Sequence, residues 1–181
     1  MSRAGATVLV ILVAAVALLA AGCGGDEASQ TSAEEWAEEF CTAVSDWRDE
    51  LEQIGEGIDD PSRLSIDALE EAADDASAAT DEFIEEVRAL GAPDTESGEE
   101  VEQSVESLAD TAEAEKEDVE EAVDDVSSLA DLPSALSTIG ESLTAMATAL
   151  QRTLDAIEEG DAGDEIRTAF EESEACDELS S

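Results

Sequence analysis

The sequence contains no histidine and no tyrosine, and its only aromatic residues are three phenylalanines and two tryptophans. The absence of histidine removes the commonest general base, the usual base of a catalytic triad and the main protein ligand for transition metals. No serine lies in a Gly-x-Ser-x-Gly elbow, and no glycine-rich loop has the spacing that cradles phosphate. We therefore expect a protein that is not an enzyme and that uses no cofactor.

Basic residues are also scarce. Seven Lys and Arg residues, of which Lys116 is the single lysine, stand against fifty Asp and Glu, for a formal charge of −43. Such a surface repels nucleic acid and anionic lipid headgroups, which excludes both as partners. It attracts a basic protein partner or weakly bound cations, although the simpler interpretation is a solvated acidic surface. The composition is also that of proteins from high-salt habitats, where screening relieves self-repulsion.

Only one long hydrophobic run is present, from Val8 to Ala21, and it contains no charge. It is shorter than the roughly 20 apolar residues that a membrane-spanning helix needs. Arg3 precedes it, and the small residues Ala20, Ala21 and Gly22 follow at its end, immediately before a cysteine. This order of charge, apolar run and small residues is typical of a secretory signal.

The same segment resembles the bacterial lipoprotein signal family, whose lipobox reads roughly Leu-Ala-Gly-Cys. The match is at Ala21, Gly22 and Cys23, while Ala20 stands where the family most often has leucine. The resemblance implies cleavage before Cys23, lipidation of Cys23 through a thioether, and often a further acyl chain on its amine. It thereby implies a lipid anchor on the extracytoplasmic face of the cell membrane. An uncleaved anchor, or a plain signal with an incidental cysteine, are the alternatives.

This interpretation divides the chain into a signal peptide (1–22), a short polar tether (23–31) and a domain (32–181). Because Arg3 lies in the signal, the mature part has six basic and fifty acidic residues and a formal charge of −44. Two cysteines remain besides Cys23, namely Cys41 and Cys176. Outside the cytoplasm an even remainder predicts a disulfide between them, with two free buried thiols as the alternative.

The domain has the apolar period of helices, and strand signals are few. We expect helices over about 32–55, from 60 or 65 to 90, from 94 or 97 to 129, over 133–159, and a short one from 164. The first is marked by a stripe of Trp36, Phe40, Val44 and Trp47. The fourth has the stripe Leu136, Ile139, Leu143, Met146, Leu150 and Ile157, and only Glu141 is charged between Pro133 and Leu150. We therefore expect the fourth helix to be the most buried.

Short loops between long helices predict an antiparallel packing. The expected fold is all-α, an up-down-up-down four-helix bundle with a short fifth C-terminal helix packed on the first helix. Helical rise places Cys41 and Cys176 at similar heights on those two helices, which supports the same disulfide. The stripes could close within one chain or partly between chains, so the oligomeric state is left open.

Three further features were weighed as candidate sites. Trp36 and Trp47 lie eleven residues apart on one face and could line a ligand or partner groove, or simply pack in the core. Glu115 falls on the stripe of the third helix, either as a site residue or as a charge reaching solvent beside Lys116. No metal site is predicted, because residues 59–70 lack the ligands of a calcium loop. Loose cation binding is the most that Glu158, Glu159, Asp161 and Asp164 support.

The mature region resembles small uncharacterised lipoproteins of actinobacteria. The shared features are a Phe-Cys pair followed by a tryptophan, a Leu-Gly-x-Pro turn and a late lone cysteine, here Phe40, Cys41, Trp47, Leu90, Gly91, Pro93 and Cys176. The resemblance implies no activity. We expect a non-enzymatic lipid-anchored envelope lipoprotein with a structural or protein-interaction role. The alternative is a solute- or cation-binding extracytoplasmic module.

Overall fold

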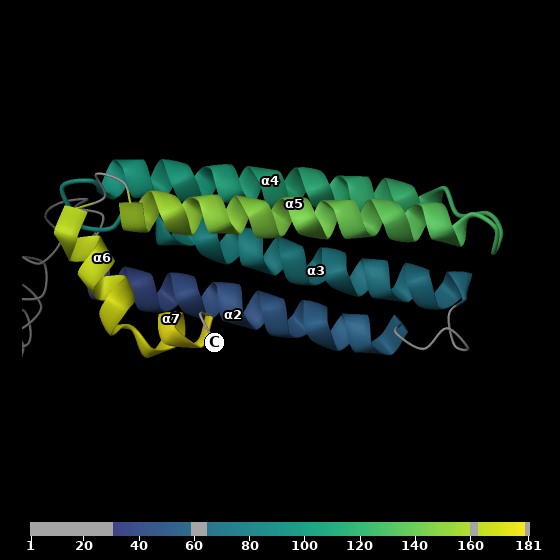
Figure 1. The fold of residues 1–181 in the computed structure, drawn as a ribbon, viewed down its shortest axis with the longest axis horizontal. Helices are drawn as coiled ribbons and strands as arrows, with labels where there is room; N and C mark the ends of the chain where they lie inside the picture. Colours follow the sequence, from purple (N-terminus) through teal and green to yellow (C-terminus); the bar gives the residue numbers. More distant parts are fainter. Residues whose placement is uncertain (1–30, 59–64, 160–162, 180–181) are drawn as a thin grey trace, which may run out of the picture.

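The structure, a computed structural model, describes residues 31–58, 65–159 and 163–179, and its secondary-structure elements in these ranges are all helices. Its helices are α2 (Ala33–Ile58), α3 (Ile66–Leu90), α4 (Gly98–Asp124), α5 (Leu132–Glu159), α6 (Gly163–Glu172) and α7 (Glu174–Leu179). The predicted signal, most of the tether and Cys23 lie outside the described residues. Figure 1 shows the four long helices side by side, with α6 and α7 at one end.

Each long helix packs on the next one along the chain: α2 on α3, α3 on α4, and α4 on α5. The helices alternate in direction, and both α6 and α7 pack against α2. The predicted all-α, up-down-up-down architecture with a C-terminal helical segment on the first helix is therefore confirmed. Within the described ranges, α2 and α5 do not pack closely along their lengths, so the bundle is more open between these two helices than elsewhere.

Helix α2 begins as its capping sequence predicts, since the Ser32 hydroxyl accepts a hydrogen bond from the Glu35 amide at 3.3 Å. Its end was predicted wrongly. Gly55 and Gly57 do not stop the helix, which continues to Ile58. Glycine inside a helix costs about 1 kcal/mol relative to alanine, a penalty that the packing of the preceding turns outweighs.

Helix α3 is bounded by local signals that the sequence carries plainly. The Ser65 hydroxyl accepts from the Ala68 amide at 3.1 Å, and the helix ends at Gly91, whose φ of 60° suits glycine. The chain then turns so tightly that a Cβ at Gly98 would lie 2.1 Å from the Pro93 carbonyl oxygen. Gly98 is therefore fixed by sterics, and α4 begins there, close to the predicted start at Ser97.

The end of α4 differs from the prediction. The helix stops at Asp124 instead of Leu129, and Leu129 is 67% exposed in the following turn. One Asp131 carboxylate oxygen accepts hydrogen bonds from the amides and hydroxyls of both Ser127 and Ser128, at 2.9–3.2 Å. The hydroxyls of Ser128 and Ser127 are the main reason that the Asp131 pKa lies below its ordinary value. A local serine–aspartate turn thus overrides the apolar period that continues through Leu129.

The buried face of α5 also differs from the prediction. Leu136 and Leu143 are 37% and 45% exposed, and α5 is not the most buried helix. Met146 and Ile157 of the predicted stripe are buried, but α5 also buries the small residues Ala135, Ser142 and Ala149, and its closest packing is with α4. Small residues let two helices approach closely, so the close α4–α5 contact turns the leucines toward the open side of the bundle.

The C-terminal segment is divided in two at Ser173, where a single helix was expected. The Ser173 carbonyl accepts from the Asp177 amide at 3.2 Å and its hydroxyl accepts from the Cys176 amide at 3.4 Å, which starts α7. The break redirects the chain so that α6 and α7 both contact α2.

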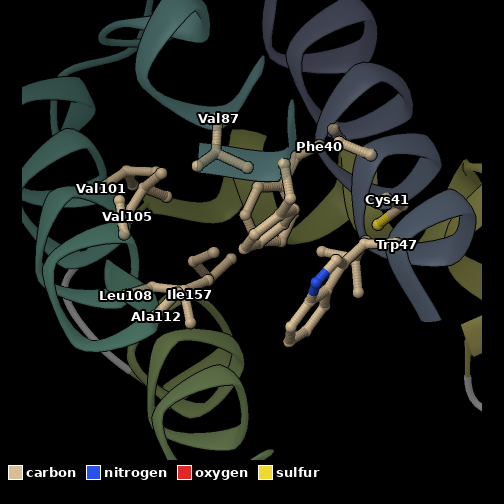
Figure 2. Packing of buried hydrophobic residues seen from close by; sticks show 14 of the residues in the cluster. Phe40, Cys41, Trp47, Val87, Val101, Val105, Leu108, Ala112 and Ile157 are labelled. Atoms are coloured by element: carbon tan, nitrogen blue, oxygen red, sulfur yellow. The ribbon is translucent and has the colours of Figure 1, made fainter. Parts of the chain in front are cut away.

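Buried side chains form two clusters. The larger unites all four long helices with α6, and Figure 2 shows Val87, Val101, Leu108 and Ile157 gathered with Phe40 and Trp47 in the interior. The smaller lies between α3, α4 and α5 near the α4–α5 turn and is made of Leu69, Ala73, Val119, Val123, Val126, Leu132 and Ala135. We call these the stapled core and the distal core. The distal core contains no aromatic residue and no residue of α2.

Candidate functional site

The structure joins Cys41 and Cys176 in a disulfide across a sequence separation of 135 residues, with their Cα atoms 5.1 Å apart. The predicted pairing is therefore confirmed, and the free-thiol alternative is not what the structure shows. Cys41 is fully buried on α2, and Cys176 lies half-buried on α7. The bond fastens the C-terminal segment to the first half of α2.

Both tryptophans are buried, with exposed fractions of 0% and 5%, although Trp47 also lies in the wall of a groove of about 320 Å³ between α2 and α3. Trp36 stacks on Phe40 with ring centroids 5.3 Å apart, and its indole N–H donates to the Gly91 carbonyl at 2.9 Å. Trp47 stacks on Phe83 at 4.6 Å, and its N–H donates to Thr80 Oγ1 at 3.2 Å. Buried indole N–H groups need such acceptors, and both have one.

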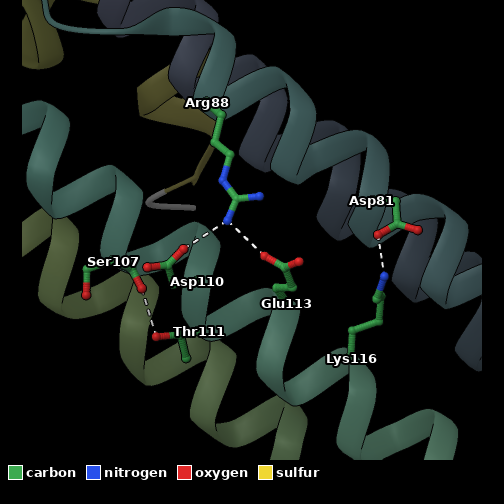
Figure 3. Close-up of polar contacts among 7 residues, drawn as sticks. All are labelled: Asp81, Arg88, Ser107, Asp110, Thr111, Glu113 and Lys116. Carbon is green, nitrogen blue, oxygen red and sulfur yellow. Dashed lines mark hydrogen bonds and ion pairs between the residues drawn. The ribbon is translucent and has the colours of Figure 1, made fainter.

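The few basic residues that the structure describes mostly pair with carboxylates. Arg88 of α3 reaches Asp110 and Glu113 of α4, both at 2.9 Å, and Lys116 of α4 pairs with Asp81 of α3 (Figure 3). The hydrogen bond to Asp81 raises the Lys116 pKa. Glu115 is half-buried beside this pair. These contacts orient α3 against α4, and exposed pairs of this kind contribute about 0–1 kcal/mol each.

An acidic groove runs between α2 and α3, with a volume of about 620 Å³. Its carboxylates are those of Glu35, Glu38, Glu39, Asp46 and Glu86. Partial loss of hydration, followed by the nearby carboxylates of Glu82, Asp46 and Glu50, raises the Glu86 pKa. Among the described residues no group of three or more acidic or cysteine side chains is arranged to hold a metal ion. Of the predicted loose cation cluster, the side chains of Glu158 and Glu159 and all of Asp161 lie outside the described residues, and Asp164 pairs with Arg167.

A second groove is apolar and lies in the half of the bundle away from α6 and α7. Its volume is about 110 Å³, and we call it the apolar groove. It is lined by Leu51, Ile54, Gly55, Leu69, Ala72, Ala73, Ala76, Ser77, Thr80, Lys116, Val119, Ile139, Leu143 and Met146. The groove exists because α3 presents small residues where α2 and α5 stand apart. Among the residues that the structure describes, no large side chain fills the space.

The apolar groove adjoins a row of exposed side chains on α5. Leu136, Gly140, Leu143 and Ala147 are all exposed and follow one another at intervals of four, three and four residues. These intervals put the four side chains on one face of the helix, which we call the α5 seam. Leu143 belongs both to the seam and to the lip of the groove. Together they form a surface that is free of carboxylates, in a chain that has fifty.

Sequence reasoning did not find this surface. The predicted stripe of the fourth helix places Leu136 and Leu143 in the core. The usable signal was the near absence of charge between Pro133 and Leu150, which is as consistent with an exposed uncharged face as with burial.

The chain matches no protein-family model, and comparison with curated proteins and with solved structures finds no significant similarity. Across the described residues, no helix combines the length and apolarity that crossing a membrane requires.

Proposed function

We propose that this protein is a lipid-anchored lipoprotein of the extracytoplasmic membrane face whose helical domain acts by binding another protein and not by catalysis. The signal features end at Cys23, which would carry the lipid. The disulfide between Cys41 and Cys176 supports an oxidising compartment, because such bonds are rare in the cytoplasm.

The observation that carries the binding role is the surface made by the apolar groove and the α5 seam, whose residues include no carboxylate and, in Lys116, a single basic side chain. Its groove, at about 110 Å³, is well below the roughly 300–1,000 Å³ of a typical small-molecule site. That volume suits one or two aliphatic side chains from a protein partner, and the seam offers the flat apolar margin that a partner helix needs.

The acidic groove favours a second candidate, the binding of weakly held cations or a basic protein segment. Its lining holds five carboxylates and no basic residue, and burial, followed by the nearby carboxylates of Glu82, Asp46 and Glu50, raises the Glu86 pKa. Because nothing fixes those carboxylates around a single point, binding there would be loose and strongly weakened by salt.

The anchor is tested by intact mass of the protein extracted from membranes, before and after reduction and alkylation. We expect a mass of residues 23–181 plus acyl groups, with two alkylated thiols appearing only after reduction. Cys23→Ser should release the chain from the membrane fraction. A released wild-type chain without acyl mass would contradict the anchor.

The binding surface is tested by placing a photocrosslinking amino acid at Leu136 of the full-length chain in living cells. We expect one discrete protein adduct on illumination. The same residue placed at Glu106, exposed on α4, is the control and should give none. Equal or absent crosslinking at both positions would contradict a protein-binding role for the seam.

A further inference from the structure

The α5 seam has the spacing of a coiled-coil core but faces solvent. Its intervals of four, three and four are those of the a and d positions, which normally insert between the side chains of a partner helix. Leu136 and Leu143 carry the large side chains, and Gly140 and Ala147 the small ones. No helix within the described ranges covers this face.

Gly140 is unexplained by the chain itself. It lies in the middle of α5, where glycine costs about 1 kcal/mol relative to alanine. A Cβ at this position would meet nothing within 4 Å, so no neighbour in the described part of the chain requires the missing side chain. Glycine at an exposed helix position permits the close approach of another helix, and at Gly140 it lies in line with two exposed leucines.

The distribution of charge over this protein indicates which kind of partner fits the α5 seam. Nearly every other face carries carboxylates, so a basic partner would be drawn to those faces and gain nothing at the seam. From Leu132 to Leu150 the only charged residue is Glu141. A second copy brings the same charge of −44, and it can approach closely only where both surfaces lack carboxylates. The seam is such a surface, and a second copy presents its match.

We propose that two copies of this chain associate through their α5 seams, antiparallel about a two-fold axis between positions 141 and 142. In that register Leu136 faces Ala147 of the other copy, and Gly140 faces its Leu143. Each large side chain therefore meets a small one, and the contact is self-complementary, as a two-fold interface must be. This inference rests on the proposed function, because it names the protein that the seam binds.

Two properties follow. The seam is only four residues long, so the dimer is weak in solution, and a shared membrane plane favours it by raising the local concentration of copies. Salt strengthens the association, because it screens the repulsion between two acidic domains, with a Debye length falling from about 10 Å at 0.1 M to about 3 Å at 1 M. Most ion-pair contacts show the opposite dependence.

The test uses the full-length chain in its membrane, with a photocrosslinking amino acid at Gly140 and a mixture of unlabelled and ¹⁵N-labelled copies. We expect a crosslinked product of twice the mass that contains both isotopes. The matched control is the same residue at Gly57, an exposed glycine of α2 that also has nothing within 4 Å. The control should give no product of twice the mass.

The second arm compares Gly140→Glu with Gly57→Glu after detergent extraction, using sedimentation velocity at low and high salt. Both variants keep the bundle folded, because neither side chain meets a neighbour. We expect only Gly140→Glu to lose the salt-strengthened dimer, with at least a tenfold rise in the dimer dissociation constant.

The outcomes separate the two proposals. A crosslink from position 140 to a different protein would overturn the second-copy inference and leave the protein-binding function in place. No crosslink from either Gly140 or Leu136, together with a monomer at all salt concentrations, would overturn both. Equal loss of dimer in both glycine variants would also overturn the seam as the interface.

Discussion

The two ends of this bundle are built differently. In the stapled core, Trp36, Phe40 and Phe170 pack together with ring centroids 5.3–6.2 Å apart, beside the disulfide. The distal core has valine, leucine and alanine only, takes nothing from α2, and adjoins the apolar groove. Large side chains and a covalent bond close one end, whereas small side chains leave the other partly open. We therefore expect stability to be concentrated at one end, while the proposed binding surface lies toward the other.

Truncating one core residue at each end should give the largest measurable contrast. Phe40→Ala removes a fully buried ring and should cost about 3–5 kcal/mol of unfolding free energy. Val123→Ala, in the distal core, removes two methyl groups and should cost about 1.5–2 kcal/mol. Urea unfolding followed by circular dichroism measures both. Equal costs at the two ends would break the comparison.

Removing the disulfide should cost slightly less than removing Phe40. The double variant Cys41→Ala, Cys176→Ala should lose about 2–5 kcal/mol, since the bond closes a loop of 135 residues. Hydrogen exchange should show protection lost first in α6 and α7 and later in α3. Reduced wild-type protein is the control and should behave like the variant. Uniform loss of protection along the chain would argue against a local staple.

Two hydroxyls on α3, three residues apart, should respond with opposite signs. Thr80 Oγ1 accepts from the Trp47 indole, so Thr80→Val leaves that N–H unpaired and should cost about 1–3 kcal/mol. Ser77 Oγ is buried without a hydrogen-bond partner in the groove wall, so Ser77→Ala should stabilise the fold by about 1 kcal/mol. Thermal unfolding distinguishes them. A destabilised Ser77→Ala variant would show that the groove wall needs its hydroxyl.

The smallest effect concerns the acidic groove. Because the Glu86 pKa is raised in the folded state, its contribution to stability is present below the unfolded pKa and lost as pH rises through the folded value. Glu86→Gln should therefore be more stable than wild type at neutral pH, by about 0.5 kcal/mol or less, and equal to it in acid. Melting temperatures at both pH values test this. Glu106→Gln, on α4 outside the groove, should show a smaller difference.

Much of the fold was predictable because local rules and packing agree over most of the chain. The apolar period of the long helices, the cap at Ser65 and the stop at Gly91 each depend on a few residues close together in the sequence. The disulfide followed from counting cysteines and from helical rise. Each of these features depends on neighbours in sequence, or on a pattern repeated often enough to fix one face.

The rest of the fold and the candidate site depend on the distances between helices. The apolar period of one helix gives no information about those distances. The nearly uncharged part of α5 contains two pairs of neighbouring residues that compete for burial. They are Ala135 with Leu136, and Ser142 with Leu143. Which member of each pair is buried depends on how closely α4 approaches. The same distance leaves the apolar groove open above the alanines of α3. The candidate site was therefore missed on α5. This helix has more apolar residues than its packing in one bundle can bury.

The disulfide also sets an order of events in time. Every residue of α2, α3, α4 and α5 precedes Cys176 in the chain, so all four long helices are synthesised before Cys41 can meet its partner. At about 5–20 residues per second, the 135 intervening positions take about 7–27 s. The disulfide can therefore form only after the sequences of all four long helices have been made.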